Sequence, residues 1–162
     1  MATALSNLSE YDASKVPNCN GAKIGIVVSE WNEEITSNLA KGAIETLLKH
    51  GVDDEDIIVK HVPGTFELPL GAQLLLDNQE DLDAVICVGC VIQGQTKHFD
   101  FVCQGATQGI MDVGLNYGVP VGFCVLTDNT IEQSRARSGG EHGNKGVEAA
   151  VTVLKMIHFN HQ

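Results

Sequence analysis

The stretch from Cys87 to Asp100, CVGCVIQGQTKHFD, contains two patterns that could carry chemistry. A Cys-x-x-Cys pair can form a redox centre or half of a metal site. A Gly-x-Thr segment followed by a histidine can form a phosphate-binding turn with a proton-transfer group beside it. The two patterns predict different kinds of site, and the elements that carry them decide between the two.

The cysteine pair is predicted to be structural. Residues 83–92, DAVICVGCVI, are mostly apolar and lack proline, which is typical of a strand buried on both faces. Side chains alternate between the faces of a strand, so Cys87 and Cys90 should point to opposite faces. The other cysteines, Cys19, Cys103 and Cys124, form no second Cys-x-x-Cys. We therefore expect no disulfide and no metal site here, and look to the polar tail for chemistry.

The composition restricts the class of protein. The chain has 162 residues, 43% of them apolar, and a formal net charge of −11, which predicts one acidic globular domain. Such a surface disfavours nonspecific nucleic-acid binding and anionic membranes, although a few local cations can still define a pocket for an anionic substrate. No apolar run approaches the roughly 20 residues that span a bilayer. Five cysteines and no recognisable signal peptide predict a reducing, cytoplasmic location.

Apolar strands alternate with amphipathic helices along the chain, which indicates a mainly parallel sheet covered on both faces. We predict an α/β fold, a three-layer αβα sandwich around a four-stranded, flavodoxin-like sheet. Residues 1–22 are polar and are interpreted as an N-terminal arm that can pair with a neighbouring subunit, and residues 23–162 as a single domain. The predicted strands are 23–28, 57–62, 83–92 and 119–127, and the predicted helices are 33–50, 66–78, 99–117, 132–137 and 145–159, the last preceded by a glycine-rich turn.

Ligands of such sheets bind outside the carboxyl ends of the strands. That rule selects four loops, which hold most of the unusual residues of the sequence. The loops are residues 29–32, 63–67, 93–98 and 127–130.

The third loop could bind phosphate. Gly94, Gln95 and Thr96 precede a helix, where free backbone amides and the helix dipole attract an anion. A plain turn with a threonine cap is the alternative. His98 follows, and its imidazole titrates near neutrality, which suits proton transfer. The alternative for this histidine is a solvated loop residue.

Other loop residues also allow two interpretations. Trp31, the only tryptophan, offers a flat surface for a planar ring or is a partly buried packing residue. Glu67 could accept hydrogen bonds from a polyol or support the first turn of its helix. Arg135 and Arg137 are the only arginines, and they could bind a phosphate or be ordinary surface charges.

Five segments resemble, in order and spacing, motifs of the 6,7-dimethyl-8-ribityllumazine synthase family. The resemblance covers residues 23–159, and its most specific part is the G-x-T-x-H-x-D pattern. Gln95 stands where alanine or serine is frequent, so its backbone amide is expected to matter more than its side chain. The segments are GIVVSEWN, VPGTFELP, VGCVIQGQTKHFD, GFCVLTDNTIEQ and HGNKG.

The resemblance implies a binding site for a ribitylated pyrimidine. Trp31 resembles the aromatic that stacks on the pyrimidine, and Asn32, Thr65 and Glu67 resemble the residues that contact the ribityl chain. Val91 and Ile92 resemble the backbone edge beside the pyrimidine, and Phe123 resembles the wall supplied by a neighbouring subunit.

It also implies a phosphate site with a proton-transfer group. Gln95 and Thr96 resemble the phosphate loop, and Arg137 the phosphate-binding arginine. Lys145 resembles a lysine near the same site, and His98 the residue that transfers protons. Arg135 matches no position of the family.

The activity implied is a condensation of 5-amino-6-(D-ribitylamino)uracil with 3,4-dihydroxy-2-butanone 4-phosphate, without metal or cofactor, in riboflavin biosynthesis. The implied assembly is a homopentamer, or a 60-mer of twelve pentamers, with sites between subunits. Three alternatives remain open at this point. An archaeal-type riboflavin synthase would need less of a phosphate site, a noncatalytic flavin carrier would release no phosphate, and a shell protein with a decayed site would lack part of the residue set.

Overall fold

The computed structural model describes residues 7–160. Its main sheet has the strand order β2-β1-β3-β4, and every neighbouring pair is parallel. The predicted four-stranded, flavodoxin-like sheet is therefore confirmed, with all of its strands parallel. The strands are β1 (Ile24–Ser29), β2 (Ile57–Val62), β3 (Ala84–Ile92) and β4 (Val121–Asp128).

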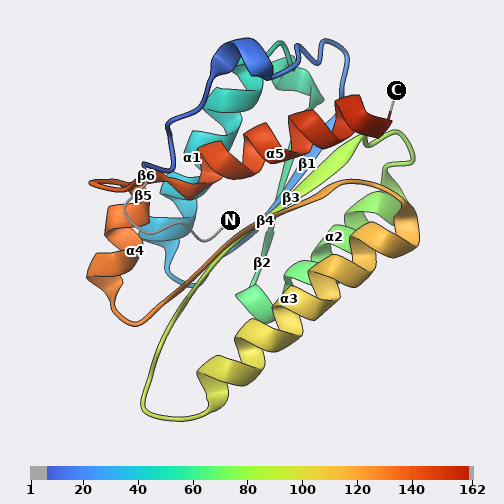
Figure 1. Cartoon of the computed structure of the whole chain (residues 1–162). Coiled ribbons are helices and arrows are strands. Elements are labelled where there is room, and N and C mark those ends of the chain that lie inside the picture. The colour runs from blue at the N-terminus through green and yellow to red at the C-terminus, as the bar shows by residue number, and fades with distance from the viewer. Residues whose placement is uncertain (1–6, 161–162) are drawn as a thin grey trace.

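Helices cover both faces of the sheet and complete the predicted three-layer sandwich (Figure 1). α1 and α5 pack against each other on one face, and α2 and α3 on the other. The apolar residues that recur every four positions along α1, Ile35, Leu39, Ala43 and Leu47, are all buried. Burial of each large side chain contributes roughly 1.5–3 kcal/mol to the stability of the fold. The helices are α1 (Glu33–Lys49), α2 (Leu68–Asn78), α3 (His98–Tyr117), α4 (Ile131–Arg137) and α5 (Lys145–Asn160).

The two cysteines of β3 point to opposite faces, as their odd spacing predicts. Cys87 belongs to the core under α2 and α3, and Cys90 to the core under α1 and α5. All five cysteines are free thiols. Burial raises the pKa of Cys87 and of Cys124 to about 12, so both remain neutral, apolar packing groups.

Two local elements differ from the sequence prediction. The helix expected from residue 66 begins with a 3-10 turn, Thr65–Glu67, and Pro69 then lies in the first turn of α2, where its missing N–H costs little. The glycine-rich turn before α5 is a small antiparallel hairpin of β5 (Ser138–Gly140) and β6 (Gly143–Asn144). Periodicity cannot reveal strands as short as these.

The described part of the N-terminal arm lies along its own chain. The backbone N–H of Leu8 donates to the carbonyl of His142, and the Tyr11 hydroxyl lies 3.1 Å from Nε2 of His50. Val16 and Cys19 are buried in the core under α1 and α5. Residues 1–6 of the predicted arm lie outside the described residues, and pairing of the arm with a neighbouring subunit stays a prediction.

The HGNKG segment contains β6 and the start of α5, and the local geometry requires glycine at two of its positions. Gly143 has a φ of +77°, which favours glycine. Asn144 donates from Nδ2 to the carbonyl of Asn38 in α1 and accepts the N–H of Gly146 at its Oδ1. A Cβ on Gly146 would overlap the carbonyl oxygen of Leu39, so α5 can approach α1 this closely only because residue 146 has no side chain.

We predict that Gly146→Ala destabilises the fold, although alanine favours helices over glycine by about 1 kcal/mol. The added methyl must push α5 away from α1, and overpacking of this kind costs about 1–3 kcal/mol or more. Denaturant unfolding monitored by circular dichroism measures the difference. Lys155→Ala, an exposed change in the same helix, should shift stability by less than about 0.5 kcal/mol. A Gly146→Ala protein as stable as the wild type would contradict the packing described.

Candidate active site

The site begins where β3 extends past β1. The two strands pair up to Val28 and Val88, whereas β3 continues to Ile92 and pairs there with β4. From Gly89 onward no strand among residues 7–160 pairs with the β1 side of β3. Backbone N–H and C=O groups on that side need other partners.

Asn32 provides one of these partners. Its Nδ2 donates to the carbonyl of Cys90 at 2.9 Å, in line with the interrupted strand. Asn32 is also the only non-glycine residue with positive φ in residues 7–160, at +59°. Asparagine tolerates this conformation better than most residues. The conformation turns the chain sharply between β1 and α1, so the residue serves both the turn and the edge of β3.

Trp31 is 72% exposed and stands beside the open edge of β3. Its backbone N–H donates to the carbonyl of Pro63, which joins the first two of the four loops. Its Cδ1 lies 3.6 Å from where a Cβ on Gly64 would be, so the indole borders the second loop. The alternative of a partly buried packing residue is therefore wrong, and the indole surface is available to a ligand.

The second loop places two polar side chains against this edge. A Cβ on Gly89 would lie 2.8 Å from Thr65 Oγ1, so the glycine in β3 makes room for the threonine. Among residues 7–160, this Oγ1 is the only buried side-chain N or O atom without a hydrogen-bond partner. Such a group carries a desolvation cost of about 1–3 kcal/mol unless a ligand or water satisfies it. The Glu67 carboxylate folds over Gly64 beside it.

These segments surround a cleft of about 660 Å³. That volume is within the usual range for small-molecule sites. Seven of the residues singled out from the sequence line it together, from the loops after β1 and β2, from β3 and from α3. The lining consists of Trp31, Asn32, Gly64, Thr65, Phe66, Glu67, Cys90, Val91, Ile92, His98, Phe101 and Val102.

Gln95 and Thr96 lie just outside this lining, in the exposed loop that ends in α3. His98, the first residue of α3, joins the loop to the cleft, and its N–H lies 3.4 Å from Thr96 Oγ1. A Cβ on Gly94 would meet nothing within 4 Å, so the chain itself does not demand glycine there. The backbone N–H groups before the N-terminus of this 20-residue helix are therefore open to an anion.

Besides Gln95 and Thr96, three of the predicted residues lie outside the cleft of their own chain. Phe123, 37% exposed, lies on the edge strand β4 on the face covered by α3. Arg137 ends α4, and Lys145 begins α5, where its Nζ lies 2.8 Å from Glu148 Oε1. A single chain therefore does not bring these side chains to the residues that line the cleft.

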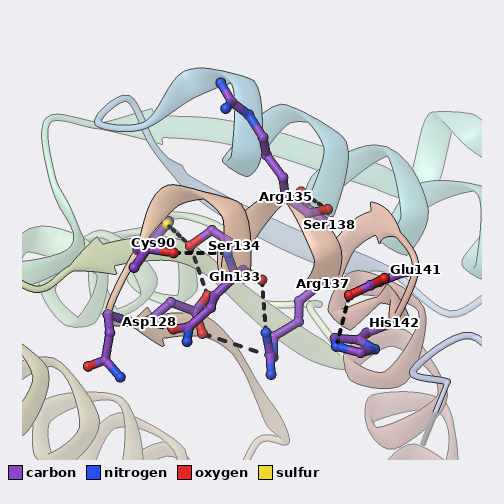
Figure 2. Close-up of polar contacts among 11 residues, drawn as sticks. Cys90, Asp128, Gln133, Ser134, Arg135, Arg137, Ser138, Glu141 and His142 are labelled. Atoms are coloured by element: carbon purple, nitrogen blue, oxygen red, sulfur yellow. Dashed lines mark hydrogen bonds and ion pairs between the residues drawn. The ribbon is translucent and has the colours of Figure 1, made fainter. Parts of the chain in front are cut away.

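The two arginines of α4 have different surroundings (Figure 2). Arg135 donates from Nε and Nη2 to the two carboxylate oxygens of Glu34, both at 2.9 Å, and so ties α4 to α1. Arg137 points the other way, donates to the carbonyl of Gln133 at 3.0 Å, and lies with Nε 4.0 Å from Asp128 Oδ1. Of the two, Arg137 is the less committed to a strong partner.

Sequence reasoning missed five residues that line the cleft. Phe66 and Phe101 are both more than half exposed, which is unusual for phenylalanine. Phe101 lies three residues after His98, so helical spacing alone could have placed it on the same side of α3. The others are Gly64, Cys90 and Val102.

The part of the chain from residue 7 to residue 160 lacks two further kinds of feature. No group of three or more histidine, cysteine, aspartate or glutamate side chains there is arranged to hold a metal ion. No helix there combines the length and apolar character needed to cross a bilayer.

Comparisons with known proteins identify the family of the chain. Residues 21–161 match the family model of 6,7-dimethyl-8-ribityllumazine synthase. Proteins of that name from Christiangramia forsetii and Parabacteroides distasonis are 57% and 56% identical, over 96% and 99% of this chain and 93% and 99% of theirs. The one from Porphyromonas gingivalis is 56% identical over 96% of each chain. The chain therefore belongs to the 6,7-dimethyl-8-ribityllumazine synthase family.

Proposed function

We propose that the protein is a 6,7-dimethyl-8-ribityllumazine synthase. It condenses 5-amino-6-(D-ribitylamino)uracil with 3,4-dihydroxy-2-butanone 4-phosphate and releases 6,7-dimethyl-8-ribityllumazine, phosphate and water. The observation that carries the proposal is the cleft at the carboxyl edge of the sheet. It gathers an exposed indole, an unpaired strand edge, an unsatisfied buried hydroxyl and a histidine next to a bare helix N-terminus.

The pyrimidine would lie on Trp31 with its polar edge against β3 at Val91 and Ile92. An exposed indole offers a face on which a planar ring can stack. The ribityl chain would extend toward Asn32, Thr65 and Glu67. Its hydroxyls both donate and accept, so they can satisfy the orphaned Thr65 hydroxyl and the carboxylate together.

The phosphate-bearing ketone would bind with its phosphate at the loop amides of residues 94–96, beside the N-terminus of α3. Its carbonyl then lies near His98, between the phosphate and the pyrimidine amine. Because two substrates are held in register, most of the acceleration comes from proximity.

The reaction follows from that placement. The 5-amino group attacks the ketone, and loss of water gives an imine. His98 moves protons during imine formation and then accepts the proton whose removal accompanies departure of phosphate. The loop amides and Arg137 stabilise the departing anion. The resulting enol tautomerises to a second carbonyl, which the ribitylamino nitrogen attacks to close the ring with loss of a second water.

We propose that each site is completed by an adjacent subunit of a homopentamer. The support is geometric, because Phe123, Arg137 and Lys145 lie outside the cleft lining of their own chain. A head-to-tail ring brings the same two unlike surfaces together at every interface, so each cleft can receive the neighbour's β4 edge and α4. The N-terminal arm, which packs on its own chain from Leu8 to Cys19, would also contact a neighbouring chain in the same assembly.

We also propose a cytoplasmic location. All five cysteines are free thiols, which suits a reducing compartment.

The direct test of the proposed activity is to mix the purified protein with both substrates. Lumazine absorbance should appear as phosphate is released in equal amount. A riboflavin synthase would instead convert added lumazine to riboflavin without phosphate, and a carrier would bind lumazine without turnover. Either result would replace the proposal.

We predict that His98→Ala slows turnover by roughly 10- to 1,000-fold, which overlaps the usual contribution of one acid–base group. Binding of the pyrimidine should survive, since His98 is exposed at the helix start and is not a packing residue. Steady-state kinetics on both substrates measure the change. An unchanged kcat would remove His98 from the mechanism.

We predict that Arg137→Ala weakens binding of the phosphate-bearing substrate by about 1.5–3 kcal/mol, the value of a charge-assisted hydrogen bond. The KM for the pyrimidine should hardly change. Arg135→Ala is the matched control, since Arg135 is paired with Glu34 on the other side of α4. If Arg135→Ala weakened the phosphate substrate and Arg137→Ala did not, the assignment would be reversed.

We predict that Trp31→Ala lowers affinity for lumazine or riboflavin by roughly 1–3 kcal/mol, by analogy with stacking of bases on aromatic side chains. Its melting temperature should hardly change, because the indole is exposed. Trp31→Phe should retain most of the affinity. Fluorescence titration of the wild type, with its sole tryptophan, should show quenching that saturates near one ligand per chain. Normal affinity in folded Trp31→Ala would exclude the stacking role.

We predict that the purified protein forms pentamers, and that these assemble into a hollow icosahedral shell. The turn between Arg137 and Asn144 is short, without the insertion that some pentamer-only members of the family carry. Light scattering and electron microscopy measure the assembly. A discrete pentamer or decamer would refute only the shell, whereas a stable and active monomer would refute the shared site as well.

A further inference from the structure

We infer that Asp128 is a positioning residue that holds the Arg137 guanidinium in place for the phosphate-bearing substrate. Asp128 is the last residue of β4, and Arg137 is the last residue of α4 (Figure 2). The inference rests on the proposed function and deepens it, because it says how the phosphate-binding arginine is fixed before the substrate arrives.

The Asp128 carboxylate is fixed by a buried network. Its Oδ2 accepts the Ser134 hydroxyl at 2.8 Å, and Ser134 is fully buried. The Ser134 oxygen in turn accepts the Cys90 thiol at 3.4 Å (Figure 2). Burial raises the pKa of Cys90, so the thiol keeps the proton that it donates. With only 11% of its side chain exposed, Asp128 has little freedom to turn away.

The other carboxylate oxygen faces the arginine. Oδ1 of Asp128 lies 4.0 Å from Nε of Arg137, and Nη1 donates to the Gln133 carbonyl at 3.0 Å. Nη2 has no hydrogen-bond or ion-pair partner within residues 7–160, and 36% of the arginine side chain is exposed. A distance of 4.0 Å is an ion pair but not a hydrogen bond. Arg137 is thus held in one orientation, while part of its guanidinium remains available to a ligand.

The backbone of Asp128 also fixes the phosphate loop. Its carbonyl accepts the N–H of Gln93 at 2.9 Å, at the start of the loop that carries Gly94 to Thr96. One residue therefore anchors both kinds of element assigned to phosphate, the loop that serves the cleft of its own chain and the arginine that serves the cleft of a neighbour. The network continues to the cleft, because the carbonyl of Cys90 accepts from Asn32.

Two effects of the carboxylate oppose each other. Its negative charge repels a phosphate, whereas its hold on the guanidinium removes conformational freedom that binding would otherwise have to restrict. Arg137 is a long and half-exposed side chain, so the ordering is large. The positive guanidinium that faces the carboxylate offsets part of the negative charge that a phosphate would meet. Positioning should therefore outweigh repulsion.

The test is a double-mutant cycle with Asp128→Asn and Arg137→Ala, measured as KM for the phosphate-bearing substrate and as the dissociation constant of inorganic phosphate by titration. Asp128→Asn should raise both the KM and the dissociation constant by roughly 3- to 30-fold, a range within the usual coupling of contacting residues. The KM for the pyrimidine should not change. In the Arg137→Ala background the same change should have almost no effect.

Asp128→Glu should partly restore phosphate affinity. Arg135→Ala is the control on the same helix, because Arg135 pairs with Glu34 and not with Asp128. Tighter phosphate binding by Asp128→Asn would show that repulsion dominates and would overturn the inference. Additive losses with Arg137→Ala, or equal losses for both substrates with a lower melting temperature, would also overturn it by showing a merely structural role. A wild type that makes no lumazine and binds no phosphate would refute the proposed function itself, and this inference with it.

Discussion

The structure depends on an unequal pair of parallel strands. β1 stops pairing at Val28, while β3 continues to Ile92 with β4 as its partner. A strand edge without a partner is costly to bury and must be satisfied by side chains, water or a ligand. Asn32 satisfies part of it through the Cys90 carbonyl. The remaining edge forms one wall of the cleft, so the shortness of β1 is what makes room for a ligand.

The rest of the site follows from that gap. The loops after β1 and β2 meet through the hydrogen bond between Trp31 and Pro63, which places the indole and the Thr65–Glu67 turn on the same side of β3. On the other side of β3, β4 stays paired with it as far as Asp128, and the Asp128 carbonyl fixes the loop before α3. The elements proposed to bind the pyrimidine and the phosphate are thus held on opposite sides of one strand. Under the proposed function, this arrangement would place the two substrates next to each other with little motion of the protein.

Much of this could be predicted from the sequence, for identifiable reasons. β3 is a short apolar run rich in β-branched residues, and α1 repeats apolar residues every four positions, so strand and helix could be told apart. The odd spacing of Cys87 and Cys90 predicted the correct faces. The carboxyl-end rule then selected the loops that line the cleft. The β5–β6 hairpin was missed because it is too short to have a period. The pairing of Arg135 with Glu34 was missed because the two residues are far apart in sequence and local spacing says nothing about them.

The sequence also could not tell which residues serve the cleft of their own chain. The resemblance assigned Phe123 to a neighbouring subunit, but nothing in the local sequence tells that Arg137 also lies outside the cleft lining that contains His98 of the same chain. The central claim is that these residues complete a neighbour's site. Subunit mixing tests it most directly, by refolding His98→Ala and Arg137→Ala chains together in equal amounts. If the site is shared in a head-to-tail ring, about a quarter of the interfaces carry both intact side chains, and activity should rise toward a quarter of the wild-type value. Activity no greater than that of the two variants refolded separately would contradict the account.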